Sequence, residues 1–426
     1  MKTLPRLLSL SAVTALLIGC EAGPYGDVAV KPSHAAPVMT ETSEPMASKA
    51  RISPVVHPMP HPGPKPRRGV VTAGDIDDGL NLAAFLRYQK RMAGRTGLAS
   101  VVTGKPVHLQ LVNASGQSAP GVAVNLRKPG AKEPFYSGYS GVDGRVLVFP
   151  AVHGAGAPTR VEIGIIDEKQ AQLRQTVRAG VHEQIAISAK GGWSPQFLDL
   201  AFVIDVSGSM GDEIAWLERE FAGLVSHARE AAPGISLRFG LVAYQSPGDF
   251  PPVRSFGFTT DATEMQRWIG SLRATGGLGG DELVGAGMEA AVELNWRRGR
   301  GERLIFQIGD EPPSKAGARR LARAARDAAR KNVQIFGLGA SGAEEEFELL
   351  LRQAAVQTGG RYLFLTDDSG VGLPHGEPNV ACYRVTLLKS LLKRVLASEL
   401  TGVRKEASKG EVIRSVGTYR DGVCLQ

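Results

Sequence analysis

Apolar residues change their spacing near Trp193, and the change divides the chain into two predicted folding regions. Between residues 98 and 191 they alternate in short runs, as in Val107, Leu109 and Leu111, and turn-forming stretches separate the runs. Strict alternation is typical of half-buried β-strands, so this region is predicted to form a small all-β, immunoglobulin-like sandwich. No group of residues in it indicates chemistry, and a spacer or adhesive role is the simplest interpretation.

After Trp193, continuous apolar runs alternate with stretches of helical period. This order predicts an α/β domain at 196–370 with a doubly wound, mostly parallel, Rossmann-like sheet that is covered on both faces. Such sheets bind ligands at the carboxyl ends of their strands. The predicted strands are 198–204, 236–244, 303–309, 333–338 and 361–365, and the predicted helices are 212–231, 261–273, 282–295, 315–331 and 343–357.

The rest of the chain is predicted to form shorter segments around these two domains. Residues 21–70 are rich in Pro, Ala and Ser and cannot bury a core, so we expect a disordered spacer there. Residues 71–97 have a helical pattern and are predicted to be a short helical segment, with Asp75 and Asp77 as capping residues at its start. Residues 371–426 are predicted to be a C-terminal extension that contains an apolar helix.

The first twenty residues have the pattern of an export signal. A short positive region precedes the apolar stretch from Leu7 to Ile18, which is too short to span a bilayer. The run Leu17-Ile18-Gly19-Cys20 resembles the bacterial lipobox, and this resemblance implies cleavage before Cys20 and attachment of lipid to it. We therefore expect an exported, lipid-anchored protein at the periplasmic face or the surface of the outer membrane. An ordinary secretory leader with a chance cysteine is the alternative.

Two further cysteines, Cys382 and Cys424, remain once Cys20 is assigned. In an oxidising compartment a single remaining pair is predicted to form a disulfide. Closing that loop would stabilise the fold by roughly 4 kcal/mol in the chain-entropy model. Two free, buried thiols are the alternative.

The formal net charge of +8 does not by itself indicate a nucleic-acid partner, because the charge is diffuse along the chain. One predicted helix, 315–331, carries a stripe of arginines, Arg319, Arg323, Arg326 and Arg330, opposite a stripe of alanines. A solvated helix face is the simplest interpretation of this stripe. An acidic partner or lipid headgroups are the alternatives.

Oxygen-bearing side chains follow two of the predicted strands. Asp205, Ser207 and Ser209 come at the carboxyl end of the first strand, where a spacing of two directs side chains of an extended loop to one side. Asp310 follows the strand 303–309 and is expected to reach the same place. Oxygen ligands suit a hard divalent cation, so Mg²⁺ is the predicted metal, with Mn²⁺ or Ca²⁺ as substitutes.

This arrangement resembles the metal ion-dependent adhesion site of the von Willebrand factor A family. The resemblance covers about residues 197–370, and Ser209-Met210-Gly211-Asp212-Glu213-Ile214 with Asp310-x-Pro312-Pro313 is most similar to a bacterial and protist branch of that family. It implies a doubly wound fold with the metal on top of the sheet. It also implies that the metal's shell is completed by an acidic side chain from a partner protein.

The third element of the family site is a threonine in the loop before the third helix, and this sequence departs there. Asp281 falls at the corresponding position, while Thr275 lies further back in the loop. A helix N-cap is the alternative role for Asp281, and both roles remain open. Three coordinating carboxylates would leave the site with a net charge of about −1, which would weaken its attraction for an acidic partner.

Three functions follow as hypotheses. The first is a membrane-anchored, metal-dependent protein-binding module of the cell envelope, whose partner is another envelope or extracellular protein and not a nucleic acid. The second is a structural envelope lipoprotein in which the metal only stabilises the fold. The third is a hydrolase, although the sequence has no Gly-x-Ser-x-Gly motif and no histidine near Ser207 or Ser209 to act as a base. We therefore expect a protein that is not an enzyme.

Overall fold

The computed structural model describes residues 70–166, 172–188, 192–277, 281–340, 343–369 and 378–425. The predicted leader, Cys20 and nearly all of the predicted spacer lie outside the described residues. In the described part of the chain, no helix combines the length and the apolar character needed to cross a membrane.

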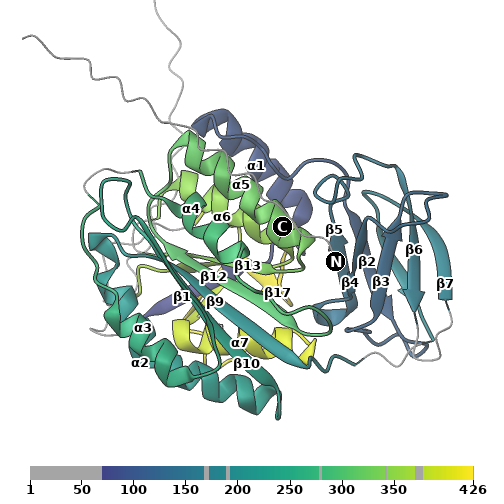
Figure 1. The fold of residues 1–426 in the computed structure, drawn as a ribbon. Coiled ribbons are helices and arrows are strands. Elements are labelled where there is room, and N and C mark those ends of the chain that lie inside the picture. Colours follow the sequence, from purple (N-terminus) through teal and green to yellow (C-terminus); the bar gives the residue numbers. More distant parts are fainter. Residues whose placement is uncertain are drawn as a thin grey trace, which may run out of the picture. The chain divides into compact units, whose positions relative to one another are not determined.

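A mixed sheet of nine strands forms the centre of the described α/β region (Figure 1). Five of its strands, β10, β9, β12, β13 and β14, are parallel neighbours, and the others add in antiparallel fashion. The strand order is β11 (Val253–Thr259), β10 (Ser236–Tyr244), β9 (Phe197–Asp205), β12 (Glu302–Gly309), β13 (Gln334–Gly339), β14 (Tyr362–Leu365), β1 (Thr72–Ile76), β15 (Tyr383–Leu387) and β16 (Arg414–Val416).

Helices cover both faces of this sheet. The central strand β9 is buried along its whole length, and its side chains alternate between two cores: Leu200 and Phe202 belong to one, Ala201 and Val203 to the other. The first core is shared with α2 (Gly211–Ala231), α3 (Ala262–Ser271) and α7 (Leu388–Thr401). The second is shared with α4 (Val284–Val292), α5 (Lys315–Arg330) and α6 (Glu345–Thr358), and α1 (Leu82–Thr96) packs against α6.

The sheet differs from the prediction in its antiparallel part. It is mixed and not mostly parallel, because strands from the chain segments before and after the predicted domain join its edge. Residues 72–76, which were predicted to belong to a helical segment, form β1 between β14 and β15. The run Thr72-Ala73-Gly74-Asp75-Ile76 is too short and too polar to show the apolar pattern of a buried strand, so it gave no strand signal. The edge strand β11 is only half-buried, so its sequence lacks the continuous apolar run of a buried strand, and it was missed as well.

Seven strands between residues 107 and 186 form two smaller sheets. Their apolar side chains, among them Val107, Leu109 and Leu111, share one buried cluster. The first sheet has the order β5 (Arg145–Val148), β2 (Val107–Val112) and β8 (His182–Ala186), and the second has β4 (Tyr136–Tyr139), β3 (Ala123–Arg127), β6 (Arg160–Ile166) and β7 (Gln172–Arg178). That they form an independent immunoglobulin-like domain stays a prediction.

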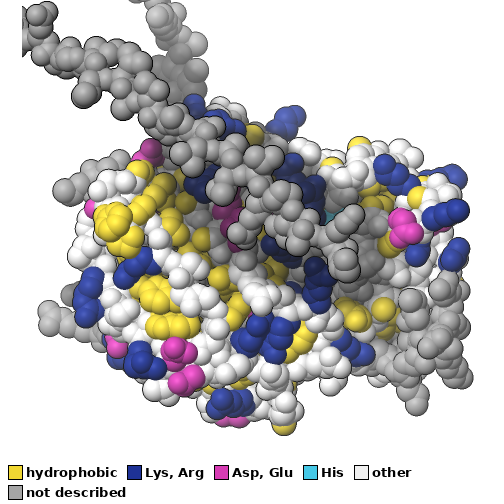
Figure 2. All heavy atoms as spheres, viewed as in Figure 1, with side chains coloured by type: hydrophobic (Ala, Val, Ile, Leu, Met, Phe, Trp, Pro, Cys, Tyr) yellow, Lys and Arg dark blue, Asp and Glu magenta, His cyan; other side chains and the backbone are white. Residues whose placement is uncertain are grey.

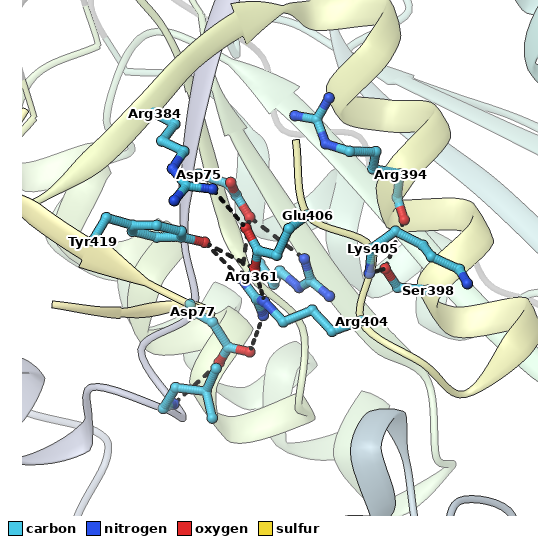
Figure 3. A network of polar contacts seen from close by, with 12 residues as sticks. Asp75, Asp77, Arg361, Arg384, Arg394, Ser398, Arg404, Lys405, Glu406 and Tyr419 are labelled. Carbon is cyan, nitrogen blue, oxygen red and sulfur yellow. Dashed lines mark hydrogen bonds and ion pairs between the residues drawn. The ribbon is translucent and has the colours of Figure 1, made fainter. Parts of the chain in front are cut away.

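The two ends of the described chain are joined by a network of buried charges (Figure 3). Asp77, which directly follows β1, pairs with Arg145 of β5 at 2.8 Å and with Arg404, beyond α7, at 3.1 Å. Arg404 also donates a hydrogen bond to the hydroxyl of Tyr419 in β17 (Thr418–Arg420). The last strand, β18 (Val423–Leu425), contains Cys424, which is bonded to Cys382 in the structure.

Candidate metal centre

Two buried carboxylates meet at the carboxyl ends of neighbouring strands. Asp205 is the last residue of β9, and Asp310 directly follows β12. The two strands are parallel and paired, with Ile204 opposite Ile308, so their ends lie side by side. Asp205 is completely buried and Asp310 is 3% exposed. The sheet therefore brings two negative charges from distant parts of the sequence to one place.

The loop after β9 adds two hydroxyl groups. One carboxylate oxygen of Asp205 accepts the backbone N–H of Ser207 at 2.8 Å, which holds the start of the loop. The hydroxyl oxygens of Ser207 and Ser209 lie 3.2 Å apart, and the Ser209 hydroxyl hydrogen-bonds to the Asp310 carboxylate. The chain then turns through a short 3₁₀ helix, Gly208–Met210, into α2. The structure thus brings together four of the predicted residues: Asp205, Ser207, Ser209 and Asp310.

Three carboxylate oxygens here are buried and have no hydrogen-bond partner among the described residues. They are Oδ2 of Asp205, Oδ1 of Asp310 and Oε2 of Glu282. A buried carboxylate oxygen without a donor is costly unless a cation or another donor satisfies it.

The electrostatics of these groups agree with that cost. Burial, together with the nearby charges of Glu282 and Asp310, raises the pKa of Asp205 well above its ordinary value. Burial also raises the pKa of Asp310, although the hydrogen bond from Ser209 opposes this rise. Burial raises the pKa of Glu282 as well. Carboxylates that repel one another in a desolvated place are stabilised in their charged form by a bound cation.

Glu282 is a residue that sequence reasoning missed. It is buried, one of its oxygens accepts the Ser246 hydroxyl at 2.8 Å, and its charge is the strongest one acting on Asp205. Its neighbour Asp281 is exposed, and the structure does not bring it into this group. The register differs because α4 begins at Val284, two residues later than predicted, and residues 281–283 are not helical. Thr275 is also exposed, although its backbone N–H donates to Val206.

The described residues suit a cation bound partly by hydroxyls. Among them, no three His, Cys, Asp or Glu side chains lie close enough to form a metal centre on their own. Two carboxylates and two serine hydroxyls, however, are oxygen donors that Mg²⁺ and Mn²⁺ accept, with water in the remaining positions. The unpartnered oxygens of Asp205 and Asp310 are the observation that supports this fit.

Two further loops frame the site. In the loop after β10, the Asp249 carboxylate accepts the backbone N–H of Gly277 at 3.3 Å. Gly277 has a positive φ of 82°, and a Cβ there would lie 3.0 Å from the Cβ of Ser207. Phe250, which follows Asp249 in the loop after β10, is 93% exposed. The backbone at Gly277 therefore lies directly against the loop of Ser207 and Ser209. Its hydrogen bond to Asp249 links that loop to the one that carries Phe250.

Comparison with known proteins identifies the α/β region. The family model described as von Willebrand factor A domain matches residues 199–359. The chain contains a von Willebrand factor A domain. The match begins within β9 and ends just after α6, so it includes both strand ends and all three loops of the candidate metal centre. It leaves out β1, β15 and α7, which complete the sheet and its cover in this chain.

A curated relative of the A domain is the alpha-protein kinase vwkA of Dictyostelium discoideum. It is 25% identical over 158 residues, which are 36% of this chain and 24% of the length of the Dictyostelium protein. The chain therefore matches about a quarter of that protein, and its name says nothing about the activity of this one.

Solved structures resemble the chain only distantly. They include BatB from Bacteroides thetaiotaomicron (16% identity, 47% of this chain and 95% of that chain, TM-score 0.32). An aerotolerance-related membrane protein from Bacteroides fragilis (15% identity, 48% and 97%, TM-score 0.30) and the pilus adhesin SpaC from Lactobacillus rhamnosus GG (13% identity, 57% and 32%, TM-score 0.33) resemble it to a similar degree.

Proposed function

We propose that this chain is a divalent-metal-dependent protein-binding protein of the bacterial cell envelope. Asp205, Ser207, Ser209 and Asp310 would hold Mg²⁺ or Mn²⁺ at the strand ends of the A domain, with Glu282 beside them. The observation that carries the proposal is the set of buried carboxylate oxygens without a hydrogen-bond partner in the described residues. A divalent cation is the group that such oxygens bind best.

The choice of ligands supports a binding role. Two of the four proposed ligands are neutral hydroxyls, so the cation's charge would be offset only by the carboxylates of Asp205 and Asp310. A bound cation would then retain the ability to accept a carboxylate oxygen from a partner protein. Glu282 adds negative charge nearby and reduces that attraction, which favours a partner that also makes contacts around the site. Phe250, exposed on the framing loop, is a suitable side chain for such a contact.

We further propose that the chain is exported and anchored through lipid on Cys20, at the periplasmic face or the surface of the outer membrane. The support is the lipobox-like run before Cys20 and the short apolar leader. An enzymatic role is not part of the proposal, since the sequence has no Gly-x-Ser-x-Gly motif and no histidine near Ser207 or Ser209 to act as a base. A serine nucleophile needs a base that takes its proton readily.

Calorimetric titration with Mn²⁺ tests the metal site. The unaltered protein should bind one ion, and Asp205→Asn and Asp310→Asn should each weaken binding at least tenfold. Both variants should melt at or above the temperature of the metal-free unaltered protein, because each removes a buried, repelled charge. Asp281→Asn, at the exposed neighbouring position, is the matched control and should bind as the unaltered protein does. Equal Mn²⁺ affinity in all four proteins would refute the site.

Binding of an identified envelope partner tests the function itself. The partner should no longer bind the unaltered protein in EDTA, and it should not bind Asp205→Asn. Adding excess Mg²⁺ should restore its binding to the unaltered protein. If metal raises only the melting temperature and leaves partner affinity unchanged, the structural role is correct. If the purified protein turns over ester or phosphate substrates and Ser209→Ala abolishes the turnover, the protein is a hydrolase.

A further inference from the structure

Helices α1 and α5 concentrate the positive charge of the chain. Between them they carry ten Lys and Arg residues and a single acidic residue, Asp327. The two helices therefore have more net positive charge than the whole chain, whose formal charge is +8. The basic residues are Arg87, Lys90, Arg91 and Arg95 on α1, and Lys315, Arg319, Arg320, Arg323, Arg326 and Arg330 on α5.

The two helices are neighbours in space although they are far apart in sequence. Both pack on α6, and one apolar cluster joins Phe85 and Met92 of α1 to Ala329 of α5. At the other end, a Cβ on Gly97 would lie 3.7 Å from the side-chain nitrogen of Lys315. In Figure 2 separate dark-blue side chains are visible around the area where Figure 1 places α1 and α5. We call this surface the basic face.

Much of this charge is not neutralised by the protein. Four of the ten side chains form ion pairs: Arg95 with Glu345, Arg320 and Arg323 with Glu289, and Arg330 with Asp327. The other six have no carboxylate within ion-pair distance in the described part of the chain, and all six residues are exposed. They are Arg87, Lys90, Arg91, Lys315, Arg319 and Arg326.

We propose that the basic face binds the phosphate groups of an anionic lipid surface. Guanidinium groups pair with phosphate through two parallel hydrogen bonds, and five of the ten side chains are arginines of α5 alone. The aromatic rings of α1, Phe85 and Tyr88, are buried, so these helices present no ring on which an unpaired base could stack. This favours headgroups over single-stranded nucleic acid. The proposal does not depend on the metal centre, which lies at the strand ends and not on this helical layer.

Sedimentation with vesicles tests the proposal. The full-length chain is produced with Cys20→Ser so that no acyl group contributes, and vesicles of phosphatidylcholine alone are compared with vesicles containing about a third phosphatidylglycerol. We expect binding to the anionic vesicles at low salt, and its loss when the salt concentration is raised tenfold. The leader also carries positive charge, at Lys2 and Arg6, so the basic face is assigned by comparing variants that share the same leader.

Two triple variants of equal charge locate the surface. Arg91→Gln, Arg319→Gln and Arg326→Gln together should weaken binding to anionic vesicles roughly a hundredfold, at about fivefold per charge. Lys128→Gln, Lys132→Gln and Lys409→Gln, at exposed lysines elsewhere, should weaken it much less. Equal loss in both variants would overturn the proposal in favour of diffuse attraction. Duplex DNA that binds more tightly than the vesicles, and through the same three arginines, would overturn it in favour of a nucleic-acid surface.

Discussion

Asp77 and Asp205 are both buried carboxylates, but the groups around them differ. Asp77 is buried, which opposes its ionisation, but the guanidinium groups of Arg145 and Arg404 outweigh burial and hold its pKa well below the ordinary value. Asp205 has no such cation, and its pKa rises. The guanidinium groups keep Asp77 charged, whereas the raised pKa of Asp205 indicates a missing ligand or a retained proton.

Glu302 is another buried acid with a raised pKa, and it lies outside the metal centre. Burial and the neighbouring charge of Glu399 raise its pKa to about 8. Between pH 4.5 and pH 8 the folded protein therefore holds a proton that the unfolded chain has released, so stability must fall as the pH rises through this window. Glu302→Gln removes the effect, and its stability relative to the unaltered protein should increase by about 3 kcal/mol from pH 5 to pH 8.

Urea unfolding at the two pH values measures this difference. Glu293→Gln, at an exposed position, is the control and should follow the unaltered protein at both. If Glu302→Gln shows the same change of stability with pH as the unaltered protein, Glu302 is ionised in the fold and the prediction is wrong.

At the scale of elements, the chemistry depends on loops whose course is less predictable than that of the strands. Asp205 and Asp310 could be placed together from the sequence because each follows a continuous apolar run, and parallel strands end at one edge. Glu282 could not, because the glycine-rich loop before it fixes no register and a shift of one residue exchanges Asp281 for Glu282. That the assembled oxygens bind a cation stays a prediction.

Gly277 lies against the loop of Ser207 and Ser209, and a substitution there tests whether the two loops are coupled. Gly277→Ala should weaken Mn²⁺ binding roughly tenfold, because the new Cβ would press on Ser207, in addition to about 1 kcal/mol of backbone strain at positive φ. Gly257→Ala is the matched control, since Gly257 has a similar φ of 74° and no atom within 4 Å of the added Cβ. It should lose stability by the same mechanism and keep its Mn²⁺ affinity. Unchanged Mn²⁺ affinity in Gly277→Ala would show that the loops are not coupled.

At the scale of the whole molecule, the A domain is completed by both ends of the described chain. The alternating strands and helices of the matched segment, 199–359, were predicted from the sequence, and so was the apolar helix that follows it, but the two strands that complete its sheet were not. Strand β1 comes before the two small sheets and β15 comes after the A domain, and they pair with each other beside β14. Neither strand has an apolar pattern long enough to reveal a partner hundreds of residues away, because sheet pairing at such a separation depends on the assembled fold.

This completion predicts that the segment 196–369 cannot fold by itself. It lacks β1 and β15, which leaves β14 as an open edge, and it lacks α7, whose apolar side chains share a core with Phe202 and Phe221. Five of those side chains, each contributing roughly 1.5–3 kcal/mol by burial, together match the typical stability of a domain. They are Leu388, Leu391, Leu392, Val395 and Leu396.

We expect the segment 196–369 to show no cooperative thermal transition by calorimetry and to aggregate through its exposed core. The segment 70–425, which retains the same A domain with both completing strands and α7, should melt cooperatively. A transition of 196–369 within a few degrees of that of 70–425 would show that the matched region is self-sufficient and that the added strands and helix only decorate it.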